Sequence, residues 1–359
     1  MAKGVAMLCV ILGHSALTAQ GIVPSHIAGI VVAVCFFFHM PLFFILSGYF
    51  MHPDRRFRWV REAKELLLTY AVTAAAVVVG GTVVSFLTSG QMGNAVETGW
   101  LWLKAAVYGA GDLSPLTLWP VEFRIGALWF LLALFWGHLF LHLLYRLKGF
   151  WRPAAVLACF VIGYASARFV WLPLSLQSGM CAVLFLYVGH VIRKRGVLAW
   201  MIGHPWVWAL LGAVWLIDIW KFSGFSLAMN QYGATPVLSF VGSFAGTFCV
   251  IGLSMLVSNG VPAMGRGFAF CGRSSLALLC VHLCEDNIMP WGVVLPSLSG
   301  LAPHIPLTLM FFVVRLALDV LLALLLYRIP VVNAWFYPQL AAKARRQSGT
   351  DPKAGRFGD

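Results

Sequence analysis

Long apolar runs alternate with short polar and basic stretches along almost the whole chain. A helix needs roughly 20 consecutive apolar residues to cross the hydrocarbon core of a bilayer. Ten windows of this kind cover residues 3–20, 27–50, 66–86, 127–144, 153–169, 174–191, 206–220, 236–257, 274–287 and 305–327. We therefore expect an all-α, polytopic integral membrane protein with about ten transmembrane helices.

The same pattern leaves no room for a separate soluble domain. The longest interval between spans, residues 87–126, contains an apolar patch of its own. After residue 327 the chain becomes polar and basic and ends in Gly, Pro and Ser, a composition that cannot bury a core. We expect one transmembrane domain over residues 1–330 and a basic, disordered cytoplasmic tail over residues 331–359.

Composition excludes a water-soluble globular protein. Hydrophobic residues make up 61% of the chain and charged residues 10%, whereas soluble domains carry about 25% charge. The net charge of +13 could suggest a nucleic-acid partner, but that function needs a basic face on a soluble domain. Here the cations lie in loops between apolar spans, so we expect membrane lipid and no nucleic acid as a partner.

The distribution of the cations predicts the orientation in the membrane. Cytoplasmic loops carry an excess of Lys and Arg, and placing the N-terminus in the cytoplasm brings most of the 25 Lys and Arg to that side. Omitting one span would move every later loop to the opposite side of the membrane. An even number of spans with both termini cytoplasmic is therefore the prediction.

Three ionisable residues in the first two spans are candidates for chemistry. Lys3 and His14 are eleven residues apart, which places them on one helix face about 16 Å from each other. His39 lies near the middle of the second span. Ionisable groups at such depth are costly and usually mark a functional site, although each histidine could instead be a packed polar residue bonded to a neighbouring helix.

A second candidate is the basic stretch that follows the second span. Its cations are Arg55, Arg56, Arg58, Arg61 and Lys64. Guanidinium groups bind phosphate oxygens in a bidentate manner, so a ligand with a cluster of phosphates would fit this stretch. Anionic lipid headgroups are the alternative.

Other polar residues indicate no site from the sequence alone. His138 and His142 have a spacing that can hold a metal, but no Glu follows His138 as a metalloprotease motif requires, and we expect no metal. Arg315 and Asp319, four residues apart in the last span, are expected to form a structural ion pair. A further set is expected at span ends that reach water: His190, His282, Glu285 and Asp286.

Several motifs together resemble the membrane-bound acyltransferase-3 family. They are Ala2-Lys3-Gly4 leading to Leu12-Gly13-His14, FHMPLFFILSGYF at 38–50, the basic stretch, ALWFLLALF at 127–135 and CGRSSLALLCVH at 271–282. Lys3 and His14 match the basic residue and the histidine of the family's first helix. The likeness covers most of the membrane domain.

The resemblance implies an O-acyltransferase in the inner membrane of a bacterium. Such an enzyme moves an acyl group, usually acetyl, from cytoplasmic acetyl-CoA to a hydroxyl of a carbohydrate or glycan intermediate. The basic stretch would hold the CoA phosphates, and His14 would act as a general base or as the acyl-accepting nucleophile.

Two further roles and one alternative complete the expectations. His39 would orient His14 or protonate the leaving thiolate, and Lys3 would hold CoA or a developing negative charge. The alternative function is a transporter that exports a glycan or a small metabolite, because a polar path between helices needs similar buried groups. Nothing in the sequence indicates an oligomeric state.

Overall fold

The computed structural model describes residues 1–109, 111–301 and 306–336, and this part of the chain is helical, with no β-strand. The helices are α1 Ala2–Ile22, α2 His26–Phe50, α3 Trp59–Glu62, α4 Leu68–Ser89, α5 Met92–Tyr108, α6 Trp129–Leu144, α7 Trp151–Ser166, α8 Leu176–Arg195, α9 Val197–Ile202, α10 Pro205–Trp220, α11 Pro236–Gly260, α12 Pro262–Arg273, α13 Ser275–Ile288, α14 Trp291–Leu301, α15 Leu307–Tyr327 and α16 Pro330–Phe336. A π-helical turn, Ala63–Leu67, joins α3 to α4, and a 3-10 turn, Gly126–Leu128, leads into α6.

The prediction of an all-α, multi-pass membrane protein is confirmed. Within the described residues, seven helical segments are long and apolar enough to cross a membrane: α1, α2, Trp59–Ser89, Gly126–Leu144, α8, α11 and α15. An eighth results if α12 and α13, which meet at an angle of 66°, form one broken span. The two remaining predicted spans coincide with shorter apolar helices, α7 and α10, so the count of ten stays a prediction.

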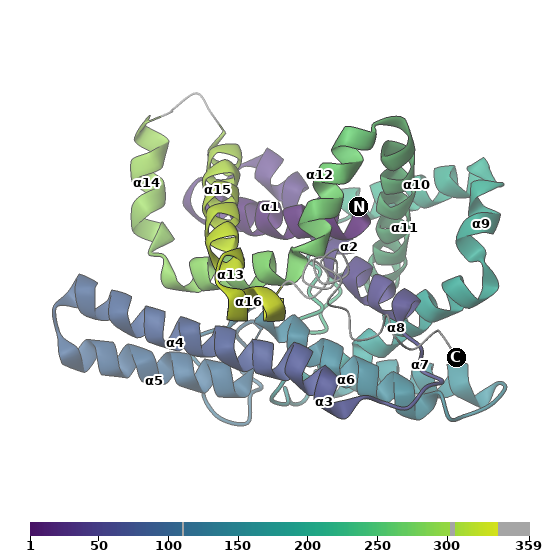
Figure 1. The fold of residues 1–359 in the computed structure, drawn as a ribbon, viewed down its shortest axis with the longest axis horizontal. Helices are drawn as coiled ribbons and strands as arrows, with labels where there is room; N and C mark the ends of the chain where they lie inside the picture. Colours follow the sequence, from purple (N-terminus) through teal and green to yellow (C-terminus); the bar gives the residue numbers. More distant parts are fainter. Residues whose placement is uncertain (110, 302–305, 337–359) are drawn as a thin grey trace, which may run out of the picture.

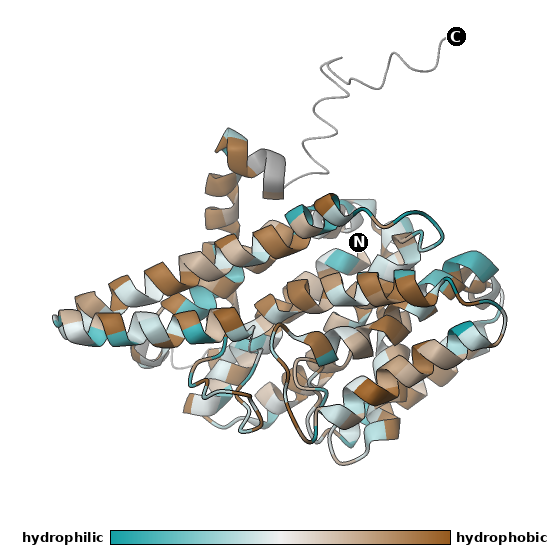
Figure 2. Ribbon diagram, turned by 90° about the horizontal axis from the view of Figure 1, so that it is seen from below, coloured by the Kyte–Doolittle hydropathy of each residue, from teal (hydrophilic) through white to brown (hydrophobic). Residues whose placement is uncertain are grey.

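The first two helices occupy the centre of the helical assembly. α2 packs against α1 on one side and α8 on the other, while α1 also contacts α12, α13 and α15. α4 and α5 lie side by side as a long pair along one edge of the molecule (Figure 1). Hydrophilic residues gather in the loops and at helix ends, and the helix bodies are mostly apolar (Figure 2). This distribution is typical of helices that are surrounded by lipid.

Glycines allow the central helices to approach each other closely. A Cβ on Gly48 of α2 would collide with the carbonyl oxygen of Leu186, and one on Gly189 of α8 would collide with that of Ile45. Helix pairs in membranes use such small residues to bring their backbones into contact. The end of α2 is therefore fixed against α8.

Several loops that carry cations meet at one end of the assembly. Arg193, near the end of α8, donates hydrogen bonds to the Tyr49 carbonyl oxygen at 3.2 Å and to His52 Nε2 at 3.1 Å. The Tyr145 hydroxyl, just after α6, lies 3.0 Å from His190 Nε2. We call this end, where α2, α6 and α8 finish and α3 begins, the basic end. The topology prediction requires these loops to share one side of the membrane, and which side that is stays a prediction.

Two segments that the sequence places outside the spans contain helices. Residues 87–126 contain α5, whose apolar residues pack along α4. The predicted tail begins at residue 331, but residues 331–336 belong to α16. The rest of the predicted tail, residues 337–359, lies outside the described residues, so its disorder stays a prediction.

Candidate active site

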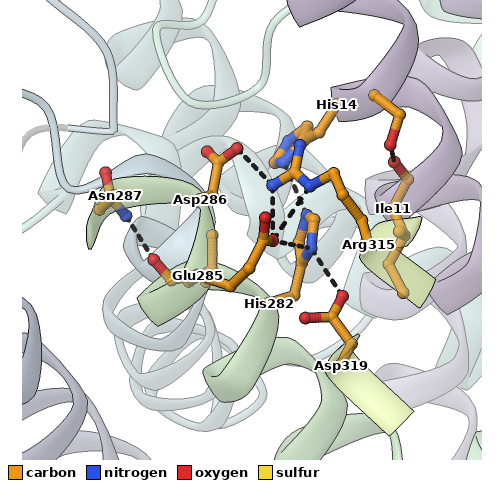
Figure 3. A network of polar contacts seen from close by, with 10 residues as sticks. Ile11, His14, His282, Glu285, Asp286, Asn287, Arg315 and Asp319 are labelled. Carbon is orange, nitrogen blue, oxygen red and sulfur yellow. Dashed lines mark hydrogen bonds and ion pairs between the residues drawn. The ribbon is translucent and has the colours of Figure 1, made fainter. Parts of the chain in front are cut away.

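The candidate site begins at His14, which lies in α1 where that helix faces α13 and α15. His14 Nδ1 lies 3.1 Å from Nε2 of His282 in α13, and the two ring centroids are 5.2 Å apart (Figure 3). His14 is half-buried, whereas His282 is completely buried. The pair therefore joins a partly exposed side chain to one that is completely buried.

The second ring nitrogen of His282 faces two carboxylates. Its Nδ1 lies 3.0 Å from Asp319 Oδ2 and 3.3 Å from Glu285 Oε2. A carboxylate only accepts, so this network assigns the hydrogen to Nδ1 of a neutral His282. Nε2 of His282 then accepts from Nδ1–H of His14. Nε2 of His14 is left with a free lone pair, which is the form that a general base needs.

Arg315 of α15 supplies the positive charge of the cluster. Its Nε and Nη2 donate to Glu285 Oε2 at 3.0 and 2.8 Å, and Nη2 also donates to Asp286 Oδ1 at 2.5 Å. The remaining guanidinium nitrogen, Nη1, is buried and has no hydrogen-bond partner among the described residues. Figure 3 shows the guanidinium beside the ring of His14. A buried donor without a partner is costly unless a ligand satisfies it.

Helical spacing explains why these side chains converge. His282, Glu285 and Asp286 lie three and four residues apart on α13, so they share one face of that helix. Arg315 and Asp319 have the same relation on α15. α1, α13 and α15 contact one another pairwise, and their polar faces meet inside an otherwise apolar assembly.

Two expectations about these residues are wrong. Arg315 and Asp319 do not pair with each other, because α13 supplies a separate partner to each: Glu285 to Arg315 and His282 to Asp319. His282 and Glu285 do not reach water at a span end, since they are 0% and 4% exposed against α1 and α15. Hydropathy alone could not show this, because it depends on which helix covers the end of α13.

A family model described as an acyltransferase domain matches residues 1–328. The chain belongs to the acyltransferase-3 family. Neither the curated proteins nor the solved structures yield a match. With its membrane-span-like helices, the chain is a membrane acyltransferase, and the pair of His14 and His282 is an acid–base group inside its helical assembly.

The structure does not bring the other two predicted catalytic residues to His14 of this acyltransferase. His39 is buried, and its Nδ1 lies 2.6 Å from the Cys35 carbonyl oxygen of the same helix. The ring of Phe36 packs against both histidines, with its centroid 6.0 Å from that of His14 and 5.1 Å from that of His39. Lys3 is exposed in the first turn of α1, next to Gly272 of α12.

The five cations of the basic stretch are all exposed at the basic end. Arg61 bonds Glu65 at 2.6 Å. Arg55 and Arg56 line an open hollow of about 290 Å³ together with Pro53, Asp54, His142, Tyr145 and Arg146. Only Arg55 and Arg56 of the stretch therefore line this concave surface, and Arg146, which follows α6, lines it with them.

A metal ion could be considered in the buried cluster, because ligand atoms of His282, Glu285 and Asp319 lie within 4.8 Å of one another. The Glu285 oxygen in this group already accepts two hydrogen bonds from Arg315. A metal cation would face that guanidinium charge at short range, which is unfavourable. The cluster fits a hydrogen-bonded proton relay better than a metal centre.

Proposed function

We propose that this acyltransferase transfers an acetyl group from cytoplasmic acetyl-CoA to a hydroxyl of a carbohydrate or glycan intermediate in the inner membrane of a bacterium. The observation that carries the proposal is the chain of contacts from half-buried His14 through His282 to Asp319. A base that is oriented by a second group, itself held by a carboxylate, is the arrangement that activates hydroxyls in acyl transfer. The family match supports acyl transfer over export.

In the proposed reaction His14 acts as the general base. Its Nε2 takes the proton of the acceptor hydroxyl while the oxygen attacks the thioester carbonyl carbon. The C–S bond then breaks, and the proton on His14 passes to the departing thiolate. Asp319 and His282 fix the tautomer and stabilise the positive charge that His14 gains in the transition state.

Arg315 is suited to stabilise the negative charge that develops on the carbonyl oxygen. Its Nη1 is a donor without a partner beside His14, and a preorganised donor in a site shielded from water lowers the energy of such an intermediate. Glu285 and Asp286 hold the guanidinium group in place through its other nitrogens. They also offset its charge, so that an empty site does not contain an isolated buried cation.

The donor would bind through its phosphates at the basic end. Arg55, Arg56 and Arg146 place three guanidinium groups around one hollow, and planar guanidinium groups match phosphate oxygens. The remaining cations of the stretch, Arg58, Arg61 and Lys64, add positive potential near it. Lys3, at the inner end of the His14 helix, would contribute in the same way.

Replacing His14 tests the proposed function. His14→Ala should lower acyl transfer about 10²- to 10⁴-fold, because that is the typical contribution of a positioned acid–base group. The measurement is the acetyl content of isolated glycans by mass spectrometry, normalised to the amount of protein in the membrane. His26→Ala, which removes an exposed histidine at the start of α2, is the matched control. Full normalised transfer by His14→Ala would refute the mechanism and favour an exporter.

A further inference from the structure

A second chain of polar side chains lies at the basic end and shares no residue with the His14 cluster. Ser47 Oγ lies 2.7 Å from His138 Nε2, and His138 Nδ1 lies 2.8 Å from Glu62 Oε2. The three residues come from three separate elements: Ser47 from the last turn of α2, Glu62 from α3 and His138 from α6.

A hydroxyl, a histidine and a carboxylate that contact one another in this order form the arrangement of an activated nucleophile. Glu62 accepts the hydrogen of His138 Nδ1, which leaves Nε2 of the neutral ring as the acceptor for the Ser47 hydroxyl. A hydroxyl within hydrogen-bond reach of a base that a third group orients is the structural sign of nucleophilic catalysis. Serine, histidine and a carboxylate act together in this way on several unrelated folds.

The surroundings of the three residues suit a reaction better than a purely structural contact. Ser47 is half-buried, and the side chains of His138 and Glu62 are 13% and 22% exposed, so a small ligand can approach. Arg61 bonds Glu65, which leaves the carboxylate of Glu62 to His138.

The position of Ser47 is fixed by its neighbour. Gly48 lies directly against the backbone of α8 at Leu186, so the last turn of α2 packs closely on α8. A nucleophile whose backbone is held in this way stays within reach of its base.

An open hollow, lined by several cations and by Asp54, lies next to this group. His142 is four residues, or about 6 Å along the helix axis, beyond His138 on α6. It lines the open hollow that also contains Arg55, Arg56 and Arg146. An acyl donor that carries phosphates would therefore bind within one helical turn of the Ser47 group.

We propose that Ser47, His138 and Glu62 form a second nucleophilic site, at which Ser47 accepts the acyl group of a thioester donor. This inference rests on the proposed function for the identity of the donor. The Ser47 oxygen attacks the thioester carbonyl carbon, and its proton passes to His138 Nε2. The O–C bond forms, the C–S bond breaks, and His138 gives the proton to the thiolate. The products are a serine ester and the free thiol.

This step is separate from the reaction at His14. Ser47 and Phe36, whose ring packs against His14, are eleven residues apart on α2, or about 16 Å along the axis. The Ser47 site is therefore expected to work without His14. Because the serine ester and the thiol can react back, the site should exchange the acyl group between acetyl-CoA and labelled free CoA.

The test uses the purified full chain in lipid nanodiscs and two kinds of probe. A fluorophosphonate reports a nucleophilic serine without any acyl-CoA, and radiolabelled acetyl-CoA reports the ester. Mass spectrometry locates each modification. The variants are Ser47→Ala, His138→Gln and Glu62→Gln, and Ser89→Ala at the exposed end of α4 is the control.

We expect both probes to modify Ser47 in the wild-type protein and in Ser89→Ala. Modification should disappear in Ser47→Ala and fall at least tenfold in His138→Gln, with a smaller fall in Glu62→Gln. It should persist in His14→Ala, although glycan acylation is lost. A correctly folded wild-type protein in which neither probe modifies Ser47, or equal modification in His138→Gln, would overturn the proposal.

A third probe separates the failure of this inference from that of the proposed function. S-acetyl-N-acetylcysteamine is a thioester without phosphates. If it acetylates Ser47 while acetyl-CoA neither acetylates the residue nor protects it from the fluorophosphonate, the nucleophilic site stands and the assignment of acetyl-CoA as donor is wrong. If glycan acetylation requires His14 and acetyl-CoA while Ser47 stays unmodified by every probe, the proposed function stands and the assignment of Ser47 as a nucleophile is wrong.

Discussion

The contact between Asp319 and His282 offers the sharpest test of the buried relay. Asp319→Asn keeps the size and shape of the side chain but removes its negative charge. In the wild type the carboxylate oxygen Oδ2 lies 3.0 Å from His282 Nδ1 and accepts its hydrogen. An amide can present its NH₂ group to the same nitrogen, which favours the other tautomer of His282. Nε2 of His282 then carries the hydrogen, and His14 loses the acceptor that keeps its own Nε2 free.

The size of the effect follows from the bond that is lost. A hydrogen bond to a charged partner contributes about 1.5–3 kcal/mol, and tenfold in rate corresponds to about 1.36 kcal/mol. Asp319→Asn should therefore slow transfer about 10- to 150-fold. Glu285, whose Oε2 lies 3.3 Å from the same nitrogen, can take over part of the role, so a loss near the lower bound is expected.

The variant should still fold, because it leaves no uncompensated charge. Arg315 keeps both of its carboxylate partners, Glu285 and Asp286. Removing one partner of a buried pair is strongly destabilising when the other charge remains without a partner. In Asp319→Asn the neighbour that loses its partner is His282, and that ring can be neutral.

The assay measures acetyl transfer in membranes that contain the variant, normalised to its abundance. Asp112→Asn, in the interval between α5 and α6, is the control, because the Asp112 carboxylate is exposed and bonds only the next backbone N–H among the described residues. If Asp319→Asn transfers acetyl as fast as the control at equal abundance, the carboxylate does not set the tautomer of His282. The relay from Asp319 to His14 would then be wrong.

Two other variants probe the charges of the protein. Arg315→Met should cost about 3–5 kcal/mol of stability, because it leaves the buried Glu285 carboxylate and the partly buried Asp286 carboxylate without their partner; a melting temperature of the purified protein equal to that of the wild type would contradict this. The double variant Arg55→Glu/Arg56→Glu should raise the KM for acetyl-CoA at least tenfold, since each lost phosphate contact contributes about 1.5–3 kcal/mol. Arg124→Glu is its exposed control, and an unchanged KM would assign the stretch to lipid binding.

The sequence was sufficient to predict the fold class, because the membrane constrains it so strongly. A spanning segment must satisfy its backbone groups internally, so each apolar window had to be a helix, and each of the ten windows coincides with one. The sequence did not predict the break between α12 and α13. That bend depends on α12 packing against α1, where Gly4 touches the backbone of Phe268.

The site was only partly predictable for a related reason. His14 was identifiable because an ionisable residue stands out in an apolar helix. Its partner His282 is 268 residues away in the sequence, and no local pattern indicates which helices will meet. The segment at 271–282 that resembles the family and ends at His282 was the available signal. Ser47 lies inside another segment that resembles the family, 38–50, but nothing in that segment singles out the serine, because its contacts come from His138 and Glu62.

The positions of the charges suggest how a highly charged donor can serve a buried base. Phosphates are too costly to move into an apolar interior, so in the proposed reaction they stay among Arg55, Arg56 and Arg146 at the basic end. The uncharged arm and acyl group carry no such cost and can pass between helices toward His14. Among the described residues, the buried cluster accordingly offsets the guanidinium of Arg315 with carboxylates and leaves the donor Nη1 of Arg315 without a partner. In the proposed reaction, such a site would recognise the charge that forms during acyl transfer and not the charge that the donor brings.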